Sequence, residues 1–324
     1  MEPIVECVPN FSEGRRQEVV DRIVRAMREA PGVQVLDVQS DADHNRSVVT
    51  AVGAPQALVE MAFRGIATAA CLIDLDDHRG EHPRMGATDV VPFVPVRGTT
   101  MQECVELARQ LGERVGRELL IPVYLYEEAA TRPERRDLAL VRRGEYEGIK
   151  AEIAVNPDRR PDYGPAELGT AGATAIGARA PLIAFNAYLN TSDVAPAKAI
   201  ARAIRGSSGG LRCVKALGLV VEGQAQVSMN LTDYRQTPIH RAVEMIRGEA
   251  ARYGLAVTRC EVVGLVPTRA LLDAAEFYLQ LQGMSQEQIL ENRLGMVARV
   301  DHEPSPRPSS YQGEGEDRAE PCPS

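Results

Sequence analysis

The sequence predicts an α/β (α+β) fold made of two ferredoxin-like βαββαβ subdomains. Short aliphatic runs alternate with segments of helical periodicity, and the same order of six elements occurs twice along the 324 residues. A stretch rich in Pro, Gly and Asp, residues 156–172, lies between the two halves, and we expect the boundary there. Hydrophobic residues make up 44% of the chain, which is enough for a core in each half built mainly from Val, Leu, Ile and Ala.

The first half begins with strand, helix, strand, strand, helix and strand. Val19, Ile23 and Met27 recur on one face of the first helix, and Pro31-Gly32 ends it. The predicted strands cover residues 4–8, 33–38, 47–53 and 90–96 and the predicted helices residues 12–30 and 55–71, with a further helix and strand over 101–118 and 121–126.

The second half repeats this order. The predicted strands cover residues 182–189, 214–221, 225–231 and 257–263, the predicted helices cover residues 195–204 and 237–253, and two more helices follow over 268–281 and 285–297. Glu222-Gly223 predicts a hairpin between the second and third of these strands.

Three segments follow from this division of the chain. We predict an N-terminal subdomain over 1–178, a C-terminal subdomain over 179–300 and a disordered tail over 301–324, which is dominated by Pro, Ser, Glu and Gly. Helices on one face of each sheet leave the other faces free, so a ligand groove is expected between the subdomains.

Composition argues against nucleic-acid and membrane partners. The net charge is −8 at pH 7, and no block of Lys and Arg stands out. There is no N-terminal secretory pattern and no apolar run long enough to span a bilayer. The six cysteines are scattered without paired spacing, which is typical of reduced thiols. We therefore expect a cytoplasmic protein.

Residues 78–89 are the most informative segment. They place two imidazoles, two guanidiniums and several carboxylates within a dozen residues that are interrupted by Gly and Pro. Such a run predicts an ordered loop whose groups titrate near neutral pH. Loops with this composition usually perform chemistry or bind charged ligands.

This loop has more than one chemical interpretation. His78, Glu81 and His82 match the H-x-x-E-H zinc pattern, but that pattern needs a helix, which Gly80 and Pro83 disfavour. No metal site is therefore predicted. The other interpretations are a structurally satisfied histidine and a single catalytic imidazole at His82 with a near-neutral pKa. Such an imidazole takes a proton from an attacking amine and returns one to a leaving amine.

Three further stretches carry polar groups that suit a ligand site. Residues 10–14 follow the first strand and open a helix, where backbone amides bind anions. Residues 41–46 form a polar turn, for which ordinary turn chemistry is the alternative. Residues 224–232 alternate so that one strand face is polar, including Gln226, which suits either a wet cleft or a solvent-facing edge strand.

A fourth stretch, residues 161–179, is rich in Gly and Ala. Close approach of a flat ligand to the backbone explains this composition, and a linker explains it equally well. The stretch is not a dinucleotide-binding fingerprint, because no G-x-G-x-x-G follows a strand and opens a helix.

Short strings in a fixed order along residues 2–297 carry a family resemblance. They are ECVPNFSEG at 6–14, GEHPRMGA at 80–87, VYLY at 123–126, GAT at 172–174, LIAFN at 182–186, QVS at 226–228 and GLVP at 264–267. Together these strings resemble the formiminotransferase domain of the folate enzymes that act in histidine breakdown.

The resemblance implies a one-carbon transferase. It would transfer the formimino group from N-formimino-L-glutamate to N5 of tetrahydrofolate, giving 5-formiminotetrahydrofolate and L-glutamate. Tetrahydrofolate would be a co-substrate bound between two α/β subdomains, with no metal, in a homodimer. In mammals the domain is fused to a cyclodeaminase, so a separate cyclodeaminase is implied here.

The resemblance also implies site residues. The catalytic histidine falls on His82. The folate-contacting stretch falls on Gly164, Pro165, Ala166, Glu167, Leu168, Gly169, Thr170, Ala171 and Gly172. The substrate-binding candidates are Asn10, Asn45, Arg46, Arg84, Arg179 and Gln226. Arg46 and Arg84 are expected to hold substrate carboxylates, because a guanidinium fork matches a carboxylate bidentately.

Glu81 or an Asp of residues 37–43 is expected to orient the His82 ring. Two positions depart from the family pattern, because Ala171 stands where mammalian-type members carry Trp, and Ala180 where relatives often carry Lys. Two other functions stay open. One is a folate-dependent formyl-group transferase that uses N-formylglutamate or 5-formyltetrahydrofolate, and the other is a folate-binding protein without turnover.

Overall fold

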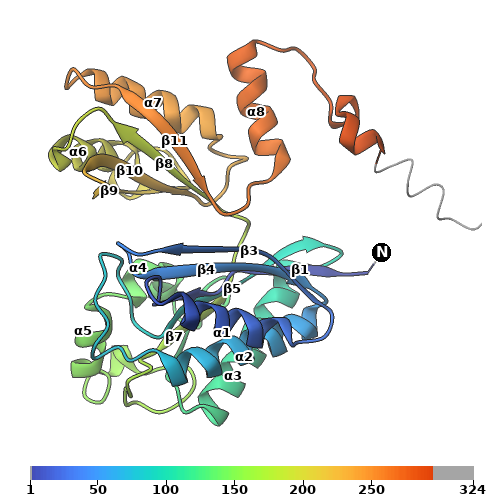
Figure 1. Cartoon of the computed structure of the whole chain (residues 1–324), viewed down its shortest axis with the longest axis vertical. Helices are drawn as coiled ribbons and strands as arrows, with labels where there is room; N and C mark the ends of the chain where they lie inside the picture. Colours follow the sequence, from blue (N-terminus) through green and yellow to red (C-terminus); the bar gives the residue numbers. More distant parts are fainter. Residues whose placement is uncertain (1, 295–324) are drawn as a thin grey trace, which may run out of the picture. The chain divides into compact units, whose positions relative to one another are not determined.

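The structure is a computed structural model that describes residues 2–294 (Figure 1). Met1–Ala274 form one compact unit, which contains two β-sheets, and the residues from Ala275 onward form a second. In the second unit the described elements are the end of α8 (Thr268–Leu279) and the short η4 (Gln286–Gln288). The predicted tail over 301–324 and the end of the helix predicted over 285–297 lie outside the described residues.

The first sheet contains the first predicted βαββαβ unit. Its elements are β1 (Ile4–Cys7), β2 (Asn10–Phe11), α1 (Gln17–Arg28), β3 (Val33–Asp41), β4 (Arg46–Gly53), α2 (Pro55–Leu72) and β5 (Thr88–Arg97). β1 and β2 both pair with β4 on one side and β5 on the other, and β3 pairs with β4; all these pairs are antiparallel. This arrangement is ferredoxin-like, as predicted.

Two strands extend this sheet beyond β5. α3 (Met101–Glu118) leads to β6 (Val123–Glu127), and β7 (Thr174–Ala178) lies between β5 and β6, parallel to both. All of β7 is buried. The sequence did not predict β7, because a short run of small residues buried on both faces lacks the alternation of a half-exposed strand. Between β6 and β7 lie η1 (Pro133–Arg136), α4 (Leu138–Val141), α5 (Glu145–Glu152) and η2 (Pro157–Arg159).

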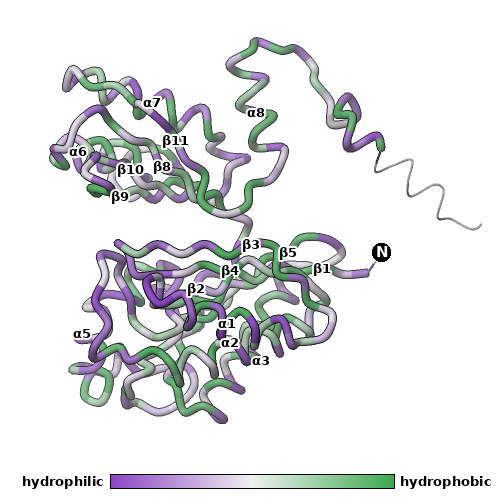
Figure 2. Tube along the Cα trace, viewed as in Figure 1, coloured by the Kyte–Doolittle hydropathy of each residue, from purple (hydrophilic) through white to green (hydrophobic). Residues whose placement is uncertain are grey.

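Helices α1, α2 and α3 lie on one side of the first sheet (Figure 1). The packing there is close, since a Cβ added to Gly65 of α2 would lie 3.0 Å from Met27 Cγ and 3.3 Å from Phe11 Cζ. Figure 2 shows hydrophobic and hydrophilic residues alternating along the helices, as expected when one face of each is buried. Because neighbouring side chains of a strand point to opposite faces, Asn10 and Arg46 point away from these helices.

The second sheet contains the repeat of the βαββαβ order. Its elements are β8 (Ile183–Leu189), α6 (Val194–Ile204), β9 (Val214–Val221), β10 (Gln224–Leu231), α7 (Ile239–Ala251) and β11 (Val257–Val263). The strand order is β11-β8-β10-β9, and every pair is antiparallel. The predicted hairpin is present, with positive φ at both Glu222 (51°) and Gly223 (73°). Both predicted βαββαβ units are thus confirmed.

The segment 156–172 packs within the first subdomain instead of separating the two. Asp162 Oδ2 accepts the backbone N–H of Leu125 at 2.8 Å and lies 2.5 Å from Nη1 of Arg135. The backbone N–H of Val123 donates to Tyr163 O at 2.9 Å. The segment is rich in Pro and Gly because the chain turns tightly here, with Gly164 at φ +83° and its Cβ position 2.5 Å from Ile121 O.

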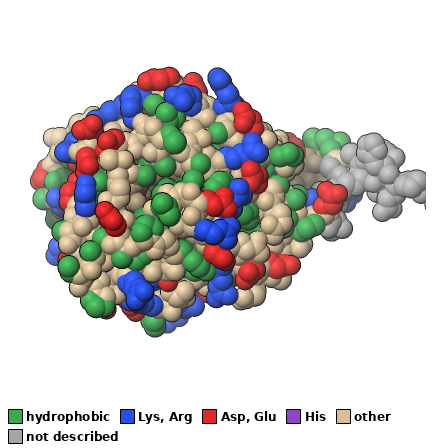
Figure 3. Space-filling view, turned by 90° about the horizontal axis from the view of Figure 1, so that it is seen from below, with side chains coloured by type: hydrophobic (Ala, Val, Ile, Leu, Met, Phe, Trp, Pro, Cys, Tyr) green, Lys and Arg blue, Asp and Glu red, His purple; other side chains and the backbone are tan. Residues whose placement is uncertain are grey.

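Charged side chains of both signs lie on the surface. Figure 3 shows acidic and basic side chains interspersed on the face in view, without a large patch of either sign. Within residues 2–294, no helix combines the length and the apolar character that crossing a bilayer requires.

Candidate active site

His82 lies in the predicted loop, in a bend between α2 and β5. The ring is half-buried, and its Nδ1 lies 2.6 Å from Pro83 O. Pro83 O accepts a hydrogen bond when Nδ1 carries the ring proton. Nη1 of Arg46 lies 2.6 Å from Nε2 and 2.5 Å from Nδ1. A cation therefore lies against the imidazole ring of the candidate base in this structure.

Arg46 is held in place by Asn10 and Asp89. Its Nε donates to Asn10 Oδ1 at 3.0 Å, and its Nη2 donates to the same oxygen. Its Nη1 lies 3.3 Å from Asp89 Oδ2. Asn10 pairs with Val48 of β4, two residues from Arg46, so the ladder places both side chains on one face. Burial lowers the pKa of Arg46 to about 10, which leaves it charged at neutral pH.

Asp89 is shared between two guanidiniums. Its carboxylate is buried, and it accepts the backbone N–H of Met85 at 3.1 Å and Nε of Arg142 at 3.3 Å, while Nη2 of Arg142 also donates to it. One carboxylate thus faces Arg46 and Arg142 together, which leaves net positive charge beside His82. The sequence did not assign a role to Asp89 or Arg142.

These surroundings set the protonation state of His82. Burial, and then the charges of Arg46 and Arg142, lower the pKa of His82 to about 2. The near-neutral pKa predicted from the sequence is therefore wrong for the unliganded protein. The imidazole is neutral at physiological pH, as a base must be, but its basicity is suppressed.

No carboxylate contacts the His82 ring within the described part of the chain. Asp41, one of the acids expected to orient it, instead lies 2.8 Å from Nδ1 of His44. The His44 ring in turn stands edge-on to His82, with centroids 6.2 Å apart. The ring is oriented by the carbonyl of Pro83 and by Arg46, so the prediction that Glu81 or an Asp of residues 37–43 orients it is wrong.

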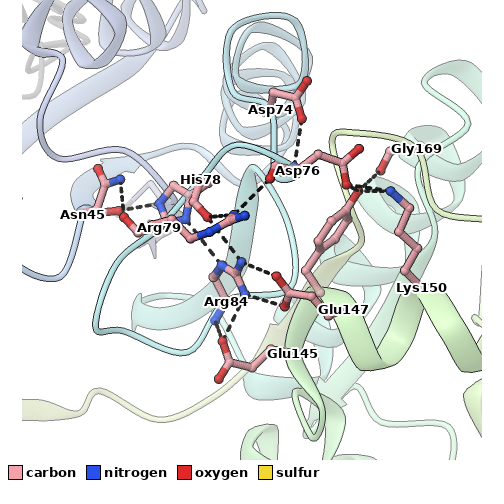
Figure 4. Close-up of polar contacts among 11 residues, drawn as sticks. Asn45, Asp74, Asp76, His78, Arg79, Arg84, Glu145, Glu147, Lys150 and Gly169 are labelled. Carbon is pink, nitrogen blue, oxygen red and sulfur yellow. Dashed lines mark hydrogen bonds and ion pairs between the residues drawn. The ribbon is translucent and has the colours of Figure 1, made fainter.

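Arg84 is committed to contacts inside the protein (Figure 4). Nη1 donates to Glu145 at 3.2 Å and Glu147 at 2.8 Å, and Nη2 donates to Glu147 at 2.7 Å and His78 O at 3.4 Å. Nε faces Nδ1 of His78 at 3.4 Å. All five N–H donors of the guanidinium are thus used. The predicted grip on a substrate carboxylate is not supported, and Arg84 instead ties the His82 loop to α5.

Asn45 and His78 also have structural contacts. Asn45 Oδ1 accepts the backbone N–H of Gly14 at 3.0 Å, and its Nδ2 donates to Arg79 O at 2.9 Å. Nε2 of the buried His78 lies 3.0 Å from Asn45 O (Figure 4), and burial lowers the pKa of His78. The substrate contact predicted for Asn45 is not supported, because both ends of its amide are used in joining the turn to the loop.

The zinc pattern is not realised as a helix. Residues 78–83 form turns and bends, with His78 directed to Asn45 and Arg84 and His82 directed to Arg46. No group of three His, Cys, Asp or Glu side chains in the described ranges is placed to hold a metal ion.

The backbone amides of Ser12 and Gly14 are already hydrogen-bonded within the protein, which does not favour the predicted anion site at residues 10–14. Gly14 N donates to Asn45 Oδ1, and Ser12 N donates to Ala87 O at 2.9 Å. The Glu13 carboxylate accepts the next two amides, those of Arg15 and Arg16, at 2.9 Å each. α1 consequently begins at Gln17 and not at residue 12.

The stretch 164–172 lies against the loop that follows His82. Gly86 and Gly172 form an antiparallel bridge, Ala87 N donates to Ala171 O at 2.8 Å, and Ala173 N donates to Met85 O at 2.9 Å. The fit requires glycine, since Gly172 has φ +69° and its Cβ position lies 2.3 Å from Met85 O. The structure thus brings the predicted folate stretch and the His82 loop together.

Arg179 and Gln226 lie apart from these contacts. Arg179 follows β7, where its backbone N–H donates to Phe93 O at 3.0 Å. Burial raises the pKa values of Glu6 and Tyr126, and the charge of Arg179 offsets part of each rise. Gln226 is buried on the polar face of β10, opposite Tyr188. β10 has neighbours on both sides, so it is not an edge strand.

Comparisons with known proteins agree with these observations. The family model "Formiminotransferase domain, N-terminal subdomain" matches residues 4–179, and "Formiminotransferase domain" matches residues 184–305. A glutamate formimidoyltransferase of Thermoplasma acidophilum is 52% identical over 301 residues, covering 92% of this chain and 99% of the relative.

Two other relatives extend the comparison. A glutamate formimidoyltransferase of Streptococcus pyogenes serotype M1 is 51% identical over 298 residues, covering 91% of this chain and 99% of the relative. A formimidoyltransferase-cyclodeaminase of Mus musculus is 43% identical over 325 residues, covering 96% of this chain and 60% of the relative. The chain belongs to the formiminotransferase family.

Proposed function

We propose that the chain transfers the formimino group of N-formimino-L-glutamate to N5 of tetrahydrofolate in histidine degradation. The observation that carries this proposal is a neutral imidazole, His82, held among Arg46, Asp89 and Arg142 beside the stretch 164–172. The relatives named as glutamate formimidoyltransferases are matched over almost their whole length, which supports the same reaction here.

The reaction exchanges one carbon–nitrogen bond for another. N5 of tetrahydrofolate attacks the amidine carbon of the donor, and a tetrahedral intermediate forms. The bond from that carbon to the glutamate nitrogen then breaks. His82 takes the proton from N5 and delivers a proton to the departing nitrogen, so L-glutamate leaves as a neutral amine and 5-formiminotetrahydrofolate remains. Proton transfer of this kind is typically worth about 10²–10⁴-fold in rate.

The remaining contributions come from binding. Both substrates carry carboxylates, and Arg46 and Arg142 are the cations beside His82 that we assign to them, with Asn10 fixing Arg46. The stretch 164–172 presents a largely exposed backbone to the folate, and Gln226 offers an amide from the second sheet. Holding two substrates in line supplies much of the remaining rate. No proposed step uses a metal.

A coupled assay tests the proposal. Wild type should release glutamate from N-formimino-L-glutamate only when tetrahydrofolate is present. H82A should lose about 10²–10⁴-fold in kcat while it still binds folate. Activity of H82A near that of wild type would refute the role of His82. Faster glutamate release from N-formylglutamate, or formyl transfer from 5-formyltetrahydrofolate to glutamate, would make the chain a formyl transferase. Folate binding without any turnover would make it a binding protein.

The assembly and pathway context are part of the same proposal. The family resemblance supports a homodimer, which sedimentation velocity tests, and the unpaired described cysteines suit the cytoplasm. The mouse relative, of which the chain covers 60%, carries cyclodeaminase in its name. Accumulation of 5-formiminotetrahydrofolate by the purified chain is the expected result.

A further inference from the structure

Arg142 is placed to bind an anion at the candidate site. It directly follows α4, and its side chain is 13% exposed. Its Nε and Nη2 donate hydrogen bonds to Asp89, whereas Nη1 has no hydrogen-bond partner among the residues that the structure describes. Arg46, by contrast, has Asn10, Asp89 and His82 as partners.

The charges around Asp89 are unbalanced. Two guanidiniums face one buried carboxylate, so the cluster is one negative charge short of neutrality. Largely buried cations without full compensation are costly, and a carboxylate that completes the set gains charge-assisted hydrogen bonds. The donor of the proposed reaction carries two carboxylates.

We propose that Arg142 and Arg46 form the subsite for a donor carboxylate, and that a carboxylate bound there draws Nη1 of Arg46 away from the His82 ring, which it contacts at both nitrogens. This inference rests on the proposed function, because it names the donor as the occupant. The base is then available only when the donor is bound.

The groups that face His82 show how a bound carboxylate would change its basicity. Arg46 comes from β4, Arg142 follows α4, and His44 comes from the β3–β4 turn. Among the nearby acids, Asp89 already serves both arginines, and Asp41 is paired with His44. The loop of His82 adds the carbonyl of Pro83. An added negative charge favours the protonated imidazole, so the donor strengthens the base that it needs. By linkage, protonation of His82 strengthens donor binding by the same factor.

Steady-state kinetics of R142Q test the subsite. Loss of a charge-assisted hydrogen bond should raise the KM for N-formimino-L-glutamate by roughly 10- to 100-fold, with the KM for tetrahydrofolate within about twofold of wild type. The matched control is R143Q, which removes the same charge from the exposed neighbouring residue. R142K, which keeps the charge but not the fork, should fall between them. Equal donor KM values for R142Q and R143Q would overturn the assignment.

A second measurement needs no turnover. The imidazole nitrogens of His82 are followed by NMR from pH 5 to 8, identified by their loss in H82Q. With N-formimino-L-glutamate alone as the probe, His82 of donor-bound wild type should begin to titrate at a higher pH than His82 of the donor-free protein. The same addition should leave the titration of His82 in R142Q unchanged. Donor binding that leaves the His82 signals unchanged, or no donor binding at all, would overturn the inference. Wild-type turnover alongside such a result would leave the proposed function intact.

Discussion

Nη1 of Arg46 lies 2.6 Å from Nε2 and 2.5 Å from Nδ1 of His82, so a cation lies against the ring of the candidate base. Asn10 accepts hydrogen bonds from Nε and Nη2 of Arg46, and Asp89 lies 3.3 Å from Nη1 itself. The basicity of His82 therefore depends on the balance of charge between Asp89 and the two arginines.

Stability should depend on pH through His82. The pKa of its imidazole is about 2 in the folded protein against 6.5 for the free side chain. The depressed pKa therefore leaves the unfolding free energy unchanged above pH 6.5. Below pH 6.5 the unfolded chain binds a proton that the folded protein does not, so the unfolding free energy falls by at most about 1.4 kcal/mol per pH unit. H82Q should flatten the decrease in unfolding free energy between pH 6.5 and 5, as measured by urea denaturation.

H44Q is the control for this slope. In wild type the ring of His44 is paired with Asp41 and stands edge-on to His82. A wild-type slope that H82Q leaves unchanged would contradict the depressed pKa.

Removing the shared carboxylate should be strongly destabilising. D89N leaves Arg46 and Arg142 beside a neutral amide, and breaking a buried pair in this way costs about 3–5 kcal/mol. The double variant D89N/R142Q removes one of the two uncompensated charges and should recover part of that loss. Chemical denaturation of the two variants and of R142Q gives the coupling. A double variant less stable than D89N would argue against the charge imbalance.

Glu147 should matter for the position of the His82 loop more than for the fold. Its pKa is lowered to about 2, chiefly by the hydrogen bond from Arg84, so its stabilisation is present above pH 4.5 and is lost toward pH 2. E147Q should cost only about 1 kcal/mol at neutral pH, since the Glu147 side chain is 60% exposed and Glu145 remains as a partner.

The same variant should reduce kcat severalfold, because Arg84 is two residues from His82 and becomes less firmly held. E113Q, which loses a wholly exposed pair with Arg117, is the matched control and should change neither quantity appreciably. An unchanged kcat in E147Q would show that α5 does not position the loop.

Gly172 should tolerate no side chain. G172A combines positive φ with a Cβ 2.3 Å from Met85 O, so it should destabilise by at least about 2 kcal/mol and weaken folate binding. G169A lies three residues earlier with open space around its Cβ position, and its stability should match wild type. Thermal unfolding distinguishes the two, and equal melting temperatures would contradict the tight contact.

Sequence patterning predicted the two βαββαβ units because each of their helices and most of their strands carries its own periodicity. It also singled out His82, since a polar loop broken by Gly80 and Pro83 is visible locally. β7 escaped prediction, because its buried small residues show no alternation.

The partners of the site were harder to foresee. Asp89 and Arg142 meet across 53 residues, and nothing near either one marks the other. Arg84 was predicted to bind substrate because the sequence does not reveal its partners inside the protein. These partners, Glu145 and Glu147, lie 61 and 63 residues further along the chain. Charge pairing over such distances is a product of the fold.

Main-chain hydrogen bonds join the His82 loop to the stretch 164–172 through Gly86, Ala87, Ala171 and Gly172. Hydrogen bonds of this kind do not use side-chain atoms, so apart from the space that Gly172 requires they leave the flanking side chains free to vary. The spacing between imidazole loop and folate stretch is thus set independently of what those residues display toward a ligand. Ala171, where the family resemblance places a tryptophan, alters the surface offered to the pterin and leaves the register of the two strands of this bridge as it was.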